Sequence, residues 1–594
     1  MKEEFREKRC ICIFAAGLLV ALTILAGRLA FFHLANFSRL KYGDYSQTSM
    51  GIRGRIFDGS ANPVQMAVSL PYWEFIADRN GFLEWHKKKE RREKVLVQVS
   101  EVLGIPYEVV STNFSAGVPW GRTLGISADP AVFDALVRNS KNVSGVKAKE
   151  IALRNYPQGR RMSHVLGFLD WQSIGVAGIE QRHELHLKGT EGLTLGKQDG
   201  SNKADAGERR IPEMDYVSVS PIPGHDIYLT LDNNIQYYVE TALKEAVERV
   251  NAAGAWAIVQ DVHTGAILAM ASYPDFDPQD RSAVPKEVWR NNAITTMYEP
   301  GSIMKTISLA AALNERLVTA NTVMDVGYGD FFYARTSLKN NASGRITVAR
   351  GFKISNNVIF AKLGLELGAR RLEAYMRAAG FDEKLEIELP GEAKGMLDWG
   401  KRPWNRWDKV KPTRVPIGQG VSVTALQMIN AYSMIANGGT LLRPYVVKQV
   451  LSSNGETIHQ GERKEIGNPI RPEVAQVMRE LMIDVTEDGT GTRARVPGYT
   501  VAGKTGTAQH AVRGGYSSTE FYASFVGFVP ARDPVFSVLV TVDRPAPGFA
   551  RTGGAVAAPA FASIATATAR YLEVPPDLPS GQDAEVRSAG VNRR

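Results

Sequence analysis

Three short motifs that follow one another along the chain constrain its fold more than any other feature. They are Ser302-Ile303-Met304-Lys305, Ser355-Asn356-Asn357 and Lys504-Thr505-Gly506-Thr507. Each motif is weak alone, since Ser-x-x-Lys recurs at Ser38 and Ser144, although Lys-Thr-Gly-Thr occurs once. Their combination predicts one serine-centred active site, so segments far apart in the sequence must meet in the folded chain.

The context of Ser302 distinguishes it from the other Ser-x-x-Lys matches. Glu299-Pro300-Gly301 precedes it, and residues 303–314 have the Ala, Leu and Ile content of a buried helix. Ser302 is therefore expected near a helix N-terminus, where free backbone N–H groups and the helix dipole favour negative charge. Lys305 follows by three residues and lies on the same helix face.

This spacing suits acyl transfer. A serine hydroxyl becomes a strong nucleophile only when an adjacent base takes its proton. Lys305 can be that base if burial or a second cation, such as Lys504, lowers its pKa. The tetrahedral intermediate also needs N–H donors for its oxyanion, and we expect them from Ser302 and from a predicted strand at residues 500–509.

The 594 residues exceed the size of one domain, and their start suggests a membrane segment. Residues 10–27 carry no charge, so residues 10–34 are predicted to be a retained transmembrane anchor after a short tail at residues 1–9. A cleaved signal peptide is the competing interpretation. Cys10 and Cys12 both lie at the start of this run, which excludes a disulfide framework in the remaining chain. The net charge of +9 is spread without a basic block, so nucleic-acid binding is not expected.

The part beyond the anchor is predicted to hold two domains. Residues 35–225 carry no catalytic constellation. Residues 226–573 show strand and helix patterns that predict an antiparallel sheet covered by helices, an α+β fold; the predicted elements are strands at 227–231, 255–261, 266–272, 523–529 and 535–542, and helices at 233–251 and 557–571. The glycine-rich residues 196–207 are predicted to be a loop, and residues 574–594 a disordered tail.

Further motifs strengthen these expectations, and the chain as a whole resembles the class B penicillin-binding proteins. The motifs that carry this resemblance are Arg53-Gly54-Arg55-Ile56-Phe57-Asp58, Arg154-Asn155-Tyr156-Pro157, Gly175-Val176-Ala177-Gly178-Ile179-Glu180, Thr230-Leu231-Asp232 and Gly418-Gln419-Gly420. The resemblance implies a penicilloyl-serine transferase (transpeptidase or β-lactamase-like) fold on an elongated, dimerisation-type pedestal.

The resemblance also implies roles for the residues of the three motifs. Ser302 would be the acylated nucleophile, Lys305 its general base, and Ser355 a proton relay. Asn357 would hold a substrate amide, and Lys504 would attract the substrate carboxylate.

The resemblance assigns the rest of the third motif to substrate binding. Thr505, Gly506 and Thr507 would bind the substrate carboxylate, and the N–H groups of Ser302 and Thr507 would form the oxyanion hole. Neither a metal nor a cofactor is expected.

The implied enzyme is a peptidoglycan D,D-transpeptidase that joins D-Ala-D-Ala stem peptides to an acceptor amine and is inhibited by β-lactams. It would be a single-pass protein of the bacterial cytoplasmic membrane, with its catalytic domain on the periplasmic or extracellular side. No glycosyltransferase signature is present, so a SEDS-type membrane glycosyltransferase and divisome proteins are the expected partners.

Asn357 favours the division-specific (FtsI-type) branch, because elongation-type relatives commonly have Asp there. Gly59-Ser60-Ala61-Asn62 departs from the Arg-Asn-Gly usual in the family. An elongation-type transpeptidase and a D,D-carboxypeptidase are the alternatives, followed by a catalytically silent β-lactam sensor or scaffold.

Two motifs point to other chemistry. Residues 498–505 match G-x-x-x-x-G-K-T, the phosphate-binding loop, but Gly506 stands where its helix should begin. His183-Glu184-Leu185-His186 is one residue short of the H-E-x-x-H zinc motif. Both are therefore disfavoured as functional sites.

Overall fold

The structure of the chain is a computed structural model that describes residues 16–28, 42–79, 82–83, 86–115, 122–138, 145–199, 215–397, 409–513 and 515–578. It forms two compact units that alternate along the chain. The first unit comprises Met1–Ile52, Leu70–Leu153 and Gly189–Pro223, and the second comprises Arg53–Ser69, Arg154–Lys188 and Gly224–Arg594. Two segments of the predicted non-catalytic domain, Arg53–Ser69 and Arg154–Lys188, thus cluster with the predicted catalytic domain.

A five-stranded antiparallel sheet forms the centre of the second unit, in the order β10-β9-β21-β20-β19. Its strands are β9 (Gly254–Asp261), β10 (Ile267–Tyr273), β19 (Ala502–Val512), β20 (Gly515–Val529) and β21 (Phe536–Asp543). Strands β9 and β10 thus share one sheet with β19, β20 and β21, which lie far along the chain, and this confirms the predicted α+β fold. The strand β19 lies at one edge.

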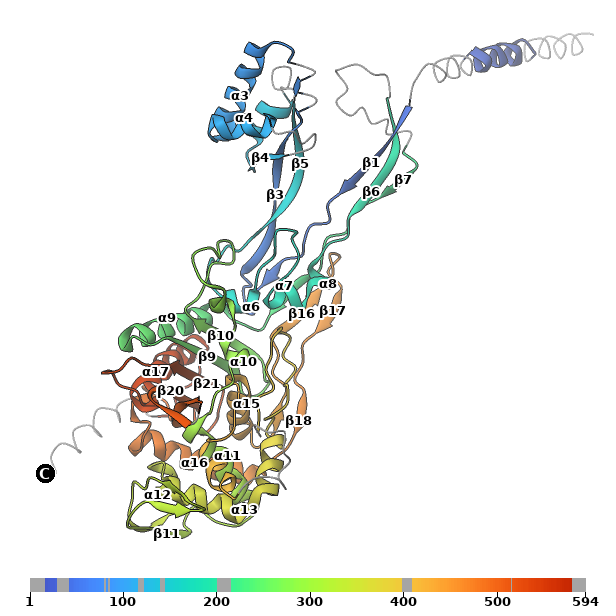
Figure 1. The fold of residues 1–594 in the computed structure, drawn as a ribbon. Coiled ribbons are helices and arrows are strands. Elements are labelled where there is room, and N and C mark those ends of the chain that lie inside the picture. Colours follow the sequence, from blue (N-terminus) through green and yellow to red (C-terminus); the bar gives the residue numbers. More distant parts are fainter. Residues whose placement is uncertain are drawn as a thin grey trace, which may run out of the picture. The chain divides into compact units, whose positions relative to one another are not determined.

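Helices cover both faces of this sheet (Figure 1). Ala257 and Val259 of β9 pack toward α9 (Asn233–Val250) and α17 (Gly553–Tyr571). The alternate residues, Trp256 and Ile258, belong to the core built with the helices of the other face. Those helices are α11 (Met304–Asn314), α13 (Asn357–Ala378), α15 (Ala425–Ala436) and α16 (Pro472–Asp488). Because both faces are covered, β9 and β21 are continuous buried runs.

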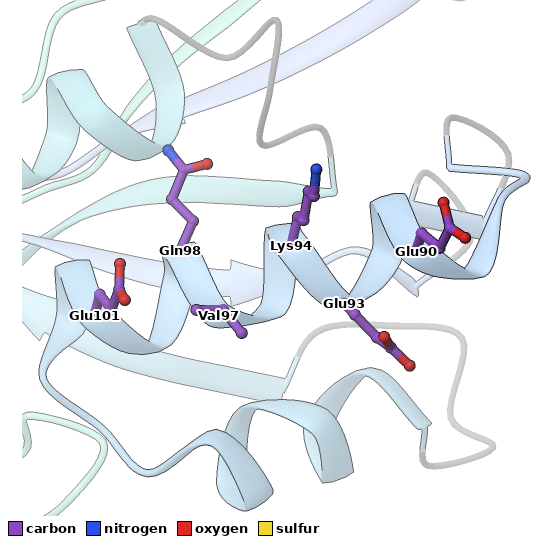
Figure 2. Close-up of a pocket in the computed structure, with 6 residues that line it drawn as sticks. All are labelled: Glu90, Glu93, Lys94, Val97, Gln98 and Glu101. Atoms are coloured by element: carbon purple, nitrogen blue, oxygen red, sulfur yellow. The ribbon is translucent and has the colours of Figure 1, made fainter.

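The first unit has its own small hydrophobic core. Helices α3 (Lys89–Leu103) and α4 (Tyr107–Ser115) pack with β4 (Arg122–Ser127) around Phe75 and Val99. The outer face of α3 carries charged and polar side chains along a shallow depression (Figure 2), lined by Glu90, Glu93, Lys94, Val97, Gln98 and Glu101. None of the predicted site residues lies there.

The loop predicted at residues 196–207 is wrong for residues 196–199. These residues belong to β6 (Gly192–Asp199), which pairs with β1 (Tyr42–Ser49) and β7 (Val217–Val219) in a three-stranded sheet. Lys197 opposes Asp44 in the antiparallel register. Pairing with a distant segment outweighs the local glycine content, because sheet formation depends on neighbouring strands. Residues 200–207 lie outside the described residues.

The two ends of the chain are described in part. Of the predicted anchor at residues 10–34, residues 16–28 are described, and they are helical and exposed. Within the described ranges, no helix has the length and hydropathy needed to cross a membrane. The predicted cytoplasmic tail at residues 1–9, together with Cys10 and Cys12, lies outside the described residues.

The predicted disorder of residues 574–594 is wrong for residues 574–578. The Asp577 carboxylate accepts hydrogen bonds from Thr500 N, at 2.7 Å, and from the Thr500 hydroxyl. Tyr499 donates its hydroxyl proton to Val574 O at 2.6 Å, and Val574 is buried. These bonds and the buried Val574 hold a segment whose composition alone suggested disorder. Residues 579–594 lie outside the described residues.

Candidate active site

Ser302 lies in a 3-10 turn, Gly301–Ile303, that leads directly into α11. The predicted helix start at residue 303 is therefore displaced by one residue, and Ser302 remains half-buried just before the helix. Gly301 has a φ of 59°, and a Cβ there would be 3.0 Å from Thr507 O. A Cβ on Gly506 would be 3.0 Å from Pro300 O. Both glycines allow the serine turn to lie directly against β19, as the sequence predicted.

Lys305 joins the first motif to the second. Its side chain is fully buried in α11, and its ammonium group donates hydrogen bonds to Ser355 O at 2.7 Å, Ser355 Oγ at 3.1 Å and Asn357 Oδ1 at 2.7 Å. Within the described part of the chain, no hydrogen bond joins Ser302 Oγ to Lys305 Nζ. Catalytic hydrogen bonds often tighten only when substrate binds.

Asn356, to which the sequence analysis assigned no role, fixes the second motif. It is fully buried, and its Oδ1 caps α13 by accepting a hydrogen bond from Ile359 N. Its amide group donates to Asn340 Oδ1 and Asn341 Oδ1, both at 2.8 Å. This anchoring holds Ser355 in a left-handed conformation with a φ of 59°. The preference of Asn for helix N-caps was the available sequence signal.

The third motif lies on the edge strand β19. Lys504 and Thr505 are buried, whereas Thr507 is exposed. The Thr505 and Thr490 hydroxyl oxygens are 2.7 Å apart, and Thr507 Oγ1 accepts a hydrogen bond from Gly553 N at 3.1 Å. Because β19 continues unbroken from Ala502 to Val512, no helix begins at Lys504. The phosphate-binding loop is therefore excluded, since its lysine must open a helix.

Two buried lysines with lowered pKa values define the electrostatics of the site. Burial lowers the pKa of Lys504 to about 7. Burial, and then the nearby charge of Lys504, lowers the pKa of Lys305 well below its usual value of 10.5. Among the described residues, neither lysine forms an ion pair with a carboxylate, so nothing restores the charged state. A lysine in this condition can accept the proton of a serine hydroxyl at neutral pH.

Further residues that the sequence analysis gave no role hold the serine turn. Glu299 Oε1 accepts hydrogen bonds from Gly420 N at 2.9 Å and from the Tyr516 hydroxyl at 3.2 Å. Gly301 N donates to Gly418 O at 3.2 Å. The sequence showed Gly418-Gln419-Gly420 only as a family motif, and nothing local connects it to residues 299–301.

The histidine motif does not form a metal site. No group of three or more metal-ligating side chains is arranged for an ion in the described ranges. His186 Nδ1 lies 3.3 Å from His225 Nδ1, which makes a hydrogen-bonded histidine pair. Burial lowers the pKa of the adjacent His183 to about 4, so the His183 side chain is uncharged at neutral pH.

Comparison with known families finds two matching models. Residues 255–566 match the model described as the penicillin binding protein transpeptidase domain. Residues 48–229 match the model described as the penicillin-binding protein dimerisation domain. The two matches together include the three catalytic motifs and the motifs at residues 53–58, 154–157 and 175–180.

Relatives with similar sequences extend over most of the chain. Stage V sporulation protein D of Bacillus subtilis is 36% identical over 440 residues, which are 73% of this chain and 66% of the relative. The probable peptidoglycan D,D-transpeptidase PenA of Neisseria meningitidis is 30% identical, over 90% of this chain and 87% of the relative. Peptidoglycan D,D-transpeptidase FtsI of Escherichia coli is 28% identical, over 96% and 92%.

Solved structures of proteins with similar names have a similar fold. A peptidoglycan synthetase from Bifidobacterium adolescentis superimposes with a TM-score of 0.71 at 26% identity, over 90% of this chain and 98% of that one. Penicillin binding protein 3 of Mycobacterium tuberculosis, complexed with aztreonam, superimposes with a TM-score of 0.66 at 25% identity, over 90% and 99%.

Proposed function

Because this chain belongs to the class B penicillin-binding proteins, we propose that it is a peptidoglycan D,D-transpeptidase of septal wall synthesis that acts through Ser302. The observation that carries the residue assignment is the position of Lys305. Its buried amine is bonded to the side chains of Ser355 and Asn357 in the second motif and lies one helical turn from the serine. Its lowered pKa suits a base that takes the serine proton.

The first half-reaction forms an acyl-enzyme. Ser302 Oγ attacks the carbonyl carbon between the two terminal D-Ala residues while its proton moves to the neutral amine of Lys305. The N–H groups of Ser302 and Thr507 receive the oxyanion. The carbon–nitrogen bond then breaks, and D-Ala leaves with a proton that Lys305 returns through the Ser355 hydroxyl.

The second half-reaction transfers the acyl group. An amine of a neighbouring stem peptide attacks the ester carbonyl and gives its proton to Lys305 through Ser355. The ester bond breaks, and Ser302 regains its proton. The terminal carboxylate of the donor binds Lys504 and the hydroxyls of Thr505 and Thr507 while the acyl-enzyme forms. A β-lactam forms the same ester without releasing a leaving group.

Gel labelling with a fluorescent penicillin tests this function. The wild type should be labelled, and Ser302→Ala should lose all labelling while keeping its melting temperature. Release of D-Ala measured with and without an acceptor amine then separates transfer from hydrolysis. A folded wild type that is never labelled would remove the proposal and favour the silent scaffold.

The cellular setting is part of the proposal. Residues 10–34 anchor the chain in the bacterial cytoplasmic membrane, and the catalytic unit works on its outer side. Asn357 in the second motif supports the division-specific branch. A SEDS-type glycosyltransferase supplies the glycan strands, since the chain carries no polymerising signature. Depletion of the protein should therefore give filaments, whereas loss of an elongation enzyme would give rounded cells.

A further inference from the structure

Arg414 lies beside the loop that supports the serine turn. It ends the short helix α14 (Lys411–Arg414) and precedes the 3-10 turn Val415–Ile417, which leads to Gly418. Its side chain is half-buried. One terminal nitrogen donates a hydrogen bond to Gln419 Oε1 at 3.2 Å, and the other donates to Ser337 O at 2.8 Å.

The charge of Arg414 has no anionic partner in the described part of the protein. Both of its hydrogen-bond acceptors are neutral, and burial lowers the pKa of its guanidinium group. A half-buried cation is costly unless a counter-charge compensates for its lost hydration. Arg414 thus differs from Arg377, which pairs with Glu373 and Asp382.

The acidic side chain that interacts with Arg414 does not supply this charge. The Tyr516 hydroxyl interacts with the charge of Arg414, but burial and the charge of Glu299 raise the pKa of Tyr516 to about 12, so the phenol stays neutral. Glu299 in turn accepts its hydrogen bonds from Tyr516 and Gly420 N. The guanidinium group therefore remains available to an external anion.

The position of Arg414 connects it to the reaction site. Gly418, four residues later, accepts a hydrogen bond from Gly301 N next to Ser302. Tyr516, which neighbours Arg414, is bonded to Glu299, three residues before Ser302. The guanidinium group thus adjoins two segments that border the nucleophile.

We propose that Arg414 binds a carboxylate of the acyl-donor peptide that lies upstream of its D-Ala-D-Ala terminus, which rests on the proposed transpeptidase function. The terminal carboxylate already has its partners in Lys504, Thr505 and Thr507, so Arg414 takes a different one. A planar guanidinium group has five N–H donors, and its two neutral bonds leave donors for a carboxylate. Arg414 would then select donor peptides whose upstream carboxylates are free over those in which they are amidated.

Matched synthetic donors test this selection. Three pentapeptides ending in D-Ala-D-Ala would carry free carboxylates on the second and third residues, an amide on one of them, or amides on both. For Arg414→Met, kcat/KM for acylation should fall about 10-fold or more with the free donor, as for loss of a charge-assisted hydrogen bond. The value for the fully amidated donor should stay unchanged. Arg414→Lys should recover part of the loss.

Two controls distinguish failure of the proposed carboxylate site from failure of the proposed transpeptidase function. Arg345→Met removes an exposed arginine from β14 (Gly344–Thr347) and should leave every rate unchanged. Fluorescent penicillin reports Ser302 acylation without the upstream carboxylate, so Arg414→Met should be labelled at the wild-type rate. An equal loss of rate with free and amidated donors would overturn the carboxylate site and leave Arg414 as a structural tether. A wild type that no penicillin labels would overturn the proposed function itself.

Discussion

Two clusters of buried cations within the second unit differ in whether a carboxylate pairs with them. The paired cations stabilise the fold, and the unpaired cations serve catalysis. In the segments Arg53–Ser69 and Arg154–Lys188, Arg53 and Arg154 both pair with Glu180, at 2.7 and 2.6 Å. In the catalytic cluster, Lys305 and Lys504 are fully buried but are bonded only to neutral oxygen atoms.

The presence or absence of a carboxylate partner decides the direction of the pKa shift at Arg53 and Lys504. Burial lowers the pKa of Arg53, but Glu180 and Glu184 outweigh it and raise the pKa overall. Burial alone lowers the pKa of Lys504, and nothing opposes it. A paired charge keeps its ionisation and holds segments together, whereas an unpaired buried lysine can exchange a proton. Burial therefore accompanies a stabilising ion pair at Arg53 and a lysine that can act as a base in the catalytic cluster.

Removing the catalytic base should have the largest effect. Lys305→Met should slow acylation by penicillin about 10²–10⁴-fold, as expected for loss of a positioned general base, and should leave the fold intact. Stopped-flow labelling measures the rate, and circular dichroism checks the fold. Lys94→Met, on the exposed face of α3 in Figure 2, is the matched control and should acylate normally. Normal acylation by Lys305→Met would assign the base elsewhere.

Removing a paired cation should act on stability instead. Arg154→Met leaves part of the Glu180 charge buried without a partner, so the free energy of unfolding should fall by about 3 kcal/mol. Urea denaturation measures it, with the exposed Arg345→Met as the control. A stability loss under 1 kcal/mol would show that the Arg154–Glu180 pair does not hold these segments together.

The pH dependence of the free energy of unfolding tests whether the pKa of the unpaired Lys504 is lowered in the folded protein. Between pH 7 and 10.5, the unfolded chain holds a proton on Lys504 that the folded chain, with its pKa of about 7, has lost. The contribution of Lys504 to stability should therefore rise with pH through this window. Urea denaturation at several pH values should show this slope in the wild type and a smaller slope in Lys504→Met. Parallel slopes would contradict the buried, depressed lysine.

The smallest effect is expected at the C-terminal segment. Asp577→Asn removes the charge from the bonds with Thr500 N and the Thr500 hydroxyl, just before β19. The free energy of unfolding should fall by about 1 kcal/mol, since these bonds lie near the end of the chain. Thermal melting beside the exposed control Glu248→Gln measures it. An unchanged melting temperature would show that residues 574–578 do not stabilise the unit.

Local patterns predicted the elements that build the site. Asp232 was predicted to cap α9, and its carboxylate accepts hydrogen bonds from Asn234 N and Ile235 N. The spacing of Ser302 and Lys305 placed both on one helical turn. Both predictions depend on hydrogen bonds and side-chain periods that act within a few residues. The roles of Ser355 and Asn357 beside them were implied only by the family resemblance.

Long-range contacts could not be predicted in the same way. The bonds of Glu299 with Gly420 and Tyr516 join three segments that no local pattern connects. Residues 196–199 form a strand because residues 42–45 pair with them. Residues 574–578 are ordered because Thr500 and Tyr499 form hydrogen bonds with Asp577 and Val574. Each depends on a partner that is distant in sequence, so composition alone suggested a loop or disorder.

The pH dependence of wild-type acylation shows whether Lys305 is the base that activates Ser302. The rate constant for labelling by a fluorescent penicillin would be measured from pH 5 to 11. If Lys305 is the base, the rate should rise as this group loses its proton, with a midpoint well below 10.5, because burial and Lys504 lower its pKa. A rate that rises only near pH 10.5 would exclude Lys305 as the base, since Lys305 would then remain charged at neutral pH and could not take the proton of Ser302.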